Sequence, residues 1–120
     1  MAAASDVIKV VLAWHAALNA GDLEQLAALS SEDVEVGGPR GSGRGRQLLR
    51  EWFGRAGITL EPKRVFERDA RVVVEQGATW STAGDEQTVA SLFEVTDGAV
   101  SRVVRYENLQ AALDAAEIAS

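Results

Sequence analysis

Residues 88–107 read TVASLFEVTDGAVSRVVRYE. Apolar side chains recur in this stretch with the period of two that is typical of strands. The Asp97-Gly98 pair in its middle favours a tight hairpin turn, because both residue types tolerate a positive φ. The pattern therefore predicts two antiparallel strands, over residues 88–95 and 100–107.

The same period extends toward the N-terminus and predicts two further strands, over residues 58–68 and 72–80. Pro62 lies inside the first of them and indicates a sheet edge or a bulge, since proline cannot donate to a strand ladder. We expect residues 83–85 to form the turn that leads to the strand over residues 88–95. Four long strands thus follow one another as a meander.

The first third of the chain has a helical pattern instead. Ser5 or Asp6 caps a first helix, whose apolar residues recur at helical spacing, and Gly21 fits just past its end. Asp22 caps a second, short helix, with Gln25 three residues later. The apolar stripe of the first helix consists of Val7, Val11, Trp14 and Leu18.

Between these helices and the meander we expect a short strand over residues 33–36, a loop over residues 37–45 and a third helix over residues 46–55. The loop has five glycines and two arginines but lacks the spacing of a phosphate-binding loop, so we interpret it as a solvated connection. Residues 109–118 are rich in alanine and predict a last helix. Helices followed by antiparallel strands imply a single α+β domain over residues 1–120.

Composition excludes several classes of function. The net charge of −6 disfavours nucleic acid as a partner, and the absence of cysteine excludes disulfides, thiolate zinc sites and a cysteine nucleophile. The acidic residues show no metal-site spacing, and we expect neither a metal nor a cofactor. No apolar run reaches the length of a membrane span, and the N-terminus does not resemble a signal peptide, so we expect a cytoplasmic protein that does not enter a membrane.

Several segments together resemble the nuclear-transport-factor-2-like superfamily, and within it the SnoaL-like and ketosteroid-isomerase-like branch. They are AALNAGDL (residues 16–23), RGR (44–46), LREWF (49–53), LFEVTDG (92–98) and VVRY (103–106). The resemblance implies a cone-shaped, curved antiparallel sheet with the N-terminal helices packed on its concave face, also called a cystatin-like roll. It also implies a pocket between helices and sheet, but not a particular activity.

The resemblance can be tested at the catalytic positions of the isomerases. They have a tyrosine where this chain has Trp14, a base aspartate where it has Gly38 and an aspartic acid where it has Ser91. Proton abstraction requires a positioned base and an oxyanion stabiliser, so we expect the isomerase mechanism to be absent. The acidic and basic set of the related epoxide hydrolases and the Asp-His pair of the polyketide cyclases have no clear match either. Whether the chain is an enzyme stays open.

The resemblance implies a mostly apolar pocket with few polar groups. Arg105 lies on the same strand face as Val103 and Glu107, and either Glu107 or a ligand carboxylate can pair with it. His15, the only histidine, is either a catalytic base or a packing residue, and we favour packing. The residues expected to line the pocket are Trp14, Leu18, Trp52, Phe53, Ala78, Trp80, Ser91, Phe93, Val103 and Arg105.

Two functions of different classes follow. The first is a small-molecule-binding protein with an apolar pocket for an apolar or amphipathic ligand. The second is a non-catalytic dimeric scaffold or interaction domain with no natural ligand. A homodimer is expected in either case, because relatives pair through the opposite strand face and apolar residues there need covering. These residues are Val73, Leu92, Val104 and Tyr106.

Overall fold

The computed structural model describes residues 6–38, 41–80 and 85–118. Its helices are α1 (Asp6–Asn19), α2 (Leu23–Ala28), α3 (Arg46–Ala56) and α4 (Leu109–Ala116). Its strands are β1 (Ser30–Gly38), β2 (Gly41–Arg44), β3 (Ile58–Arg68), β4 (Arg71–Trp80), β5 (Gln87–Thr96) and β6 (Ala99–Tyr106). The α+β class and the order of elements agree with the sequence-based expectation.

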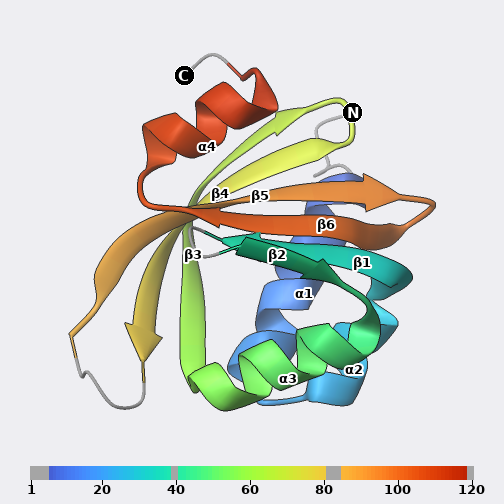
Figure 1. Cartoon of the computed structure of the whole chain (residues 1–120). Coiled ribbons are helices and arrows are strands. Elements are labelled where there is room, and N and C mark those ends of the chain that lie inside the picture. Colours follow the sequence, from blue (N-terminus) through green and yellow to red (C-terminus); the bar gives the residue numbers. More distant parts are fainter. Residues whose placement is uncertain (1–5, 39–40, 81–84, 119–120) are drawn as a thin grey trace.

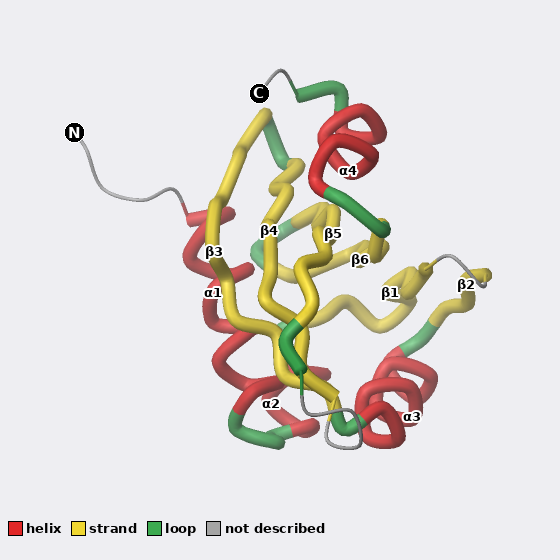
Figure 2. Tube along the Cα trace, turned by 90° about the vertical axis from the view of Figure 1, so that its left-hand side faces the viewer, coloured by secondary structure: helices red, strands yellow, loops and turns green. Residues whose placement is uncertain are grey.

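The six strands form one curved, unclosed sheet in the order β2-β1-β6-β5-β4-β3 (Figure 1). Neighbouring strands run antiparallel, except that β1 and β6 pair in parallel. This pair brings the first strand beside the last one. Helices α1, α2 and α3 lie on the concave side of the sheet, and α4 lies over the other face (Figure 2).

Local chemistry accounts for the predicted turns and caps. Asp97 and Gly98 have φ values of 52° and 78°, as the expected two-residue hairpin requires. The side chain of Asp22 accepts a hydrogen bond from the amide of Gln25 at 3.1 Å and so caps α2. The β3 strand lies at a sheet edge, and its register with β4 shifts just after Pro62. Both expectations for Pro62, an edge and a bulge, are confirmed.

The expectation of a loop over residues 37–45 is wrong for residues 37–38 and 41–44, which are in strands, whereas residues 39 and 40 lie outside the described residues. The β1 strand continues to Gly38, and residues 41–44 return antiparallel to it as β2. Close packing explains why glycine suits this hairpin: a Cβ on Gly43 would lie 2.2 Å from Cδ2 of Leu48 at the start of α3. Gly43 therefore lets the strand pair pass close to the helix, where composition alone suggested irregular structure.

The larger core lies between α1 and the concave face of the sheet. Trp14 is completely buried at its centre and meets three rings edge-on or nearly so: Phe53, Phe93 and His15, at centroid distances of 5.3, 5.1 and 5.7 Å. Aromatic pairs prefer such geometry. Asn19 then fixes the end of α1 to β3, because its side-chain amide exchanges two hydrogen bonds of 2.8 and 2.9 Å with the backbone of Leu60.

A second core lies on the opposite face, where Ala112, Leu113 and Ala116 of α4 cover Val73 and Leu92. Two of the four residues assigned to a dimer face are therefore already buried within one chain. Among the described residues, no helix is long and apolar enough to cross a membrane.

Candidate functional site

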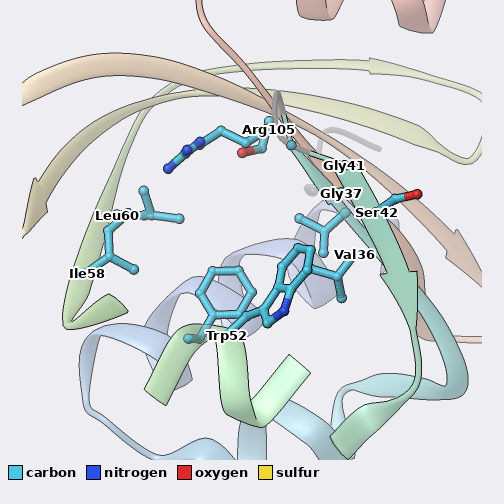
Figure 3. A pocket seen from close by; sticks show the side chains of 12 residues that line it. Val36, Gly37, Gly41, Ser42, Trp52, Ile58, Leu60 and Arg105 are labelled. Atoms are coloured by element: carbon cyan, nitrogen blue, oxygen red, sulfur yellow. The ribbon is translucent and has the colours of Figure 1, made fainter. Parts of the chain in front are cut away.

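The main cavity lies between α3, the β1–β2 hairpin and the concave face of β3, β5 and β6, and has a volume of about 410 Å³. Figure 3 shows Arg105 reaching into it from the sheet, with Ile58 and Leu60 on one side, Val36 on the other and Trp52 below. Most of the lining is apolar. The lining residues are Val36, Gly37, Gly38, Gly41, Ser42, Trp52, Phe53, Ile58, Leu60, Ser91, Val103 and Arg105.

Helix α3 supplies the floor of the cavity. Its amphipathic pattern turns Leu49 into the core, where it is completely buried, and places Trp52 and Phe53 beside the cavity. Trp52 is 38% exposed, which places it where the cavity meets solvent, whereas Phe53 packs against Trp14. The exposed part of the Trp52 indole is an apolar surface that a bound ligand can cover.

Arg105 supplies the positive charge of the cavity. It lies on β6 directly opposite Ser91 of β5, and its guanidinium carbon is 5.6 Å from the centre of the Trp80 ring. This distance is within the range of a cation–π contact. In the part of the chain that the structure describes, Arg105 makes no hydrogen bond or ion pair through its side chain, and Glu107, its expected partner, is exposed beyond the end of β6. The half-buried guanidinium thus faces the cavity without a protein carboxylate.

Ser91 begins a chain of buried polar groups that leads away from the cavity. Its hydroxyl donates to Oε1 of Gln76 at 2.8 Å, and Nε2 of Gln76 lies 2.8 Å from Nε2 of His15. On the other side of the imidazole ring, Nδ1 of His15 lies 2.8 Å from the carbonyl oxygen of Val11. The three side chains are at most 2% exposed. Each is satisfied by its neighbours, as buried polar groups must be.

Burial lowers the pKa of His15 from 6.5 to about 4, and the hydrogen bond to the Val11 carbonyl opposes only part of this effect. The imidazole is therefore neutral at neutral pH. Its hydrogen-bonded connection to the cavity runs through the Gln76 amide and the Ser91 hydroxyl, neither of which ionises at neutral pH. The geometry favours the packing interpretation of His15 over that of a general base in contact with a ligand.

The structure divides the residues expected to line the pocket into two groups. Trp52, Phe53, Ser91, Val103 and Arg105 line the cavity together. The others are core residues that do not line it, apart from Trp80, which is half-buried beside the Arg105 guanidinium. The core group consists of Trp14, Leu18, Ala78 and Phe93.

Sequence analysis missed one whole wall of the cavity, because it assigned the glycine-rich segment to a solvated loop. The missed residues also include the first apolar positions of β3, whose period of two was the available signal. They are Val36, Gly37, Gly38, Gly41, Ser42, Ile58 and Leu60.

Among the described residues, the cavity lining holds the guanidinium of Arg105 and the hydroxyls of Ser42 and Ser91 but no carboxylate, thiol or imidazole. The Ser91 proton is directed at an amide and not at a base, so the hydroxyl lacks the partner that activates a serine nucleophile. Within residues 6–38, 41–80 and 85–118, no group of three or more histidine, aspartate or glutamate side chains is placed to hold a metal ion. The arrangement is suited to binding and orienting a molecule.

Comparison with known proteins places the chain beside small proteins of similar fold. The family model described as SnoaL-like domain matches residues 11–103. No curated protein matches the sequence significantly. Solved structures cover nearly the whole chain.

A nuclear-transport-factor-2-like protein of unknown function from Cytophaga hutchinsonii has 16% identity and a TM-score of 0.79, over 92% of this chain and 97% of that one. TerC, crystallised with polyporic acid, has 23% identity and a TM-score of 0.75, over 94% and 99% of the two chains. A protein proposed to be a ketosteroid isomerase, from Kribbella flavida, has 23% identity and a TM-score of 0.75, over 84% and 76%. At such identities the likeness is one of fold.

Proposed function

The chain belongs to the SnoaL-like domain family, and we propose that it is a small-molecule-binding member whose cavity takes a ligand with a hydrophobic body and an anionic or carbonyl end. The observation that carries this proposal is Arg105, a guanidinium facing an apolar cavity without a carboxylate partner among the described residues. Removing a charge from water is costly unless the charge is paired. A ligand carboxylate or enolate would pair with it directly.

The shape of the cavity supports the same proposal. About 410 Å³ is within the range of small-molecule sites, and apolar walls with a few polar groups are their usual composition. TerC, which has a similar fold, was crystallised with polyporic acid. A cone filled by its tryptophans would have favoured the scaffold alternative, but Trp14 lies in the core and Trp52 borders open space.

Isomerase chemistry would need a base and an oxyanion donor directed into the cavity, and the residues at the two matching positions supply neither. Gly38 lines the cavity and has no side chain. The Trp14 indole N–H donates to the Ser30 hydroxyl at 3.3 Å and is not directed at the cavity. We therefore expect no ketosteroid isomerisation above the buffer rate.

The test compares the binding of naphthoate with that of its neutral carboxamide, followed by quenching of tryptophan fluorescence. Trp52 lines the cavity and Trp80 contacts the guanidinium, so a bound ring should quench both. Replacing Arg105→Met should weaken naphthoate roughly 10- to 100-fold, the usual value of a charged hydrogen bond, and the carboxamide much less. The matched control is Arg64→Met, on an exposed arginine paired with Glu75.

Equal loss for both compounds in the Arg105 variant would refute anion binding at this residue. If neither compound quenches the wild-type protein at millimolar concentration, the small-molecule function fails, and the scaffold interpretation takes its place.

A further inference from the structure

The hydrogen-bonded chain from Ser91 through Gln76 to His15 indicates a property of the ligand that Arg105 alone does not. We infer that Ser91 presents only hydrogen-bond acceptors to the cavity, so that the ligand bears a hydroxyl or amino donor in addition to its anionic end. The inference rests on the proposed binding function, and it specifies the class of ligand: hydroxylated or aminated carboxylates and enolates.

The argument begins at the Val11 carbonyl, which can only accept a hydrogen bond. Nδ1 of His15 lies 2.8 Å from it and must therefore carry the proton of that nitrogen. The imidazole is 1% exposed, and its two hydrogen-bonding partners are the uncharged carbonyl of Val11 and amide of Gln76. A neutral ring has one N–H, so Nε2 of His15 is left as an acceptor.

The orientation of Gln76 follows from this tautomer. An acceptor at Nε2 of His15 requires a donor 2.8 Å away, and only the amide nitrogen of Gln76 can donate. The amide oxygen must then point the other way, toward Ser91. The reverse orientation would place the amide oxygen against the lone pair of the imidazole, inside a core where no water can separate them.

Ser91 is the last group in the chain. Its Oγ lies 2.8 Å from the amide oxygen of Gln76, which is an acceptor only, so the single serine proton is used in that bond. The lone pairs that remain are the part of the hydroxyl available to the cavity that Ser91 lines. The direction of the Ser91 hydroxyl is therefore set by a backbone carbonyl three hydrogen bonds away.

Arg105 and Ser91 consequently give the cavity two polar groups of opposite kind. Arg105 can only donate, and Ser91 can only accept, and the two residues lie directly opposite each other on neighbouring strands. A ketone, ether or ester oxygen placed at Ser91 would meet lone pairs. A hydroxyl or amine there would complete the chain with a fourth hydrogen bond.

The experiment uses three naphthoate series: unsubstituted naphthoate, a set of hydroxynaphthoate isomers, and the methyl ether of each isomer. At least one hydroxy isomer should bind roughly fivefold tighter than its methyl ether and than plain naphthoate, the value of one net hydrogen bond. Ser91→Ala should abolish this advantage, so that each hydroxy isomer binds no tighter than its methyl ether, because alanine offers no acceptor to the ligand hydroxyl. Ser101→Ala, a hydroxyl deletion on the other face of β6, is the control and should preserve the advantage.

Two measurements test the direction of the chain itself. Nitrogen NMR of the imidazole in the ligand-free protein should show the Nδ1–H tautomer of the only histidine, and finding Nε2–H would overturn the inference at its first step. Gln76→Leu frees the Ser91 proton, so the hydroxy-to-methoxy preference should fall toward one. An unchanged preference in that variant would mean that Gln76 does not set it.

The outcomes separate this inference from the proposed function. If naphthoate binds through Arg105 but no hydroxy isomer exceeds its methyl ether, the acceptor role of Ser91 is wrong and the proposed function stands. If no naphthoate binds at all, both are wrong, whatever the tautomer of His15.

Discussion

Burial of His15 makes the stability of the fold depend on pH in a defined interval. In the folded protein its pKa is about 4, compared with 6.5 for an ordinary histidine, which represents the unfolded chain. Between these values the unfolded state binds a proton that the folded state does not, so stability falls as pH falls. The difference corresponds to about 3 kcal/mol, present in full above pH 6.5 and lost by about pH 4.

Urea denaturation at several pH values between 7 and 4 measures this dependence. The carboxylates also titrate near its lower end, so the contribution of His15 is the difference between wild type and His15→Gln, which has no imidazole. We expect the wild-type protein to lose about 3 kcal/mol more than the variant over this interval. If the free energies of unfolding of the two proteins changed equally with pH, His15 would bind its proton in the folded state as readily as in the unfolded chain.

The residue scale also shows how far the site could be read from sequence. Helical spacing placed Trp14 and Trp52 on the apolar sides of their helices. Spacing shows which side of a helix faces inward, but not whether that side borders the packed core or a cavity. The contrast between them, completely buried and 38% exposed, depends on how α1 and α3 lie against the sheet. The role of Gln76 was missed for a related reason. The hydrogen-bonding partners of a polar residue inside an apolar strand cannot be predicted until the residues that pack around it are known.

Whole elements were easier to predict than the surfaces they cover. The strand from Ile58 to Arg68 has the predicted bounds, and the last helix lies within the predicted range, because period and composition are local signals. The position of α4 over Val73 and Leu92 is not a local property. The β1–β2 hairpin was missed because glycine in sequence indicates a loop. The close approach of Gly43 to Leu48 of α3, which favours glycine there, cannot be seen from composition.

The contact of α4 with the sheet gives a prediction at the scale of elements. Leu113 is 1% exposed between α4 and the outer strand face, so Leu113→Ala should lower the free energy of unfolding by about 2 to 4 kcal/mol. Gln110→Ala, on the exposed side of the same helix, is the control and should change it by less than about 0.5 kcal/mol. Thermal or urea unfolding measures both, and a similar small loss in both variants would mean that α4 does not stabilise the domain.

At the scale of the whole molecule, α4 covers only part of the outer sheet face. Val104 and Tyr106 of β6 are half-buried on this face. Tyr106 packs against the second core beneath α4, and Val104 lies between it and the ion-paired Arg102 along the strand. The expectation of a dimer therefore rests on a smaller apolar surface, at Val104 and Tyr106 of β6, and not on the centre of the sheet. A patch of apolar side chains bordered by ion pairs is still typical of an interface.

We expect a homodimer through this narrower face. Light scattering at micromolar concentration should give twice the 12.8 kDa mass of one chain. Val104→Glu places a charge at the centre of the face and should shift the protein toward monomer, because an unpaired carboxylate would lose its water there. Ala16→Glu, on the exposed side of α1, adds the same charge away from the sheet and should leave the dimer intact. A monomer mass for the wild-type protein would contradict the prediction. A dimer that survives Val104→Glu would mean that the copies pair through another surface.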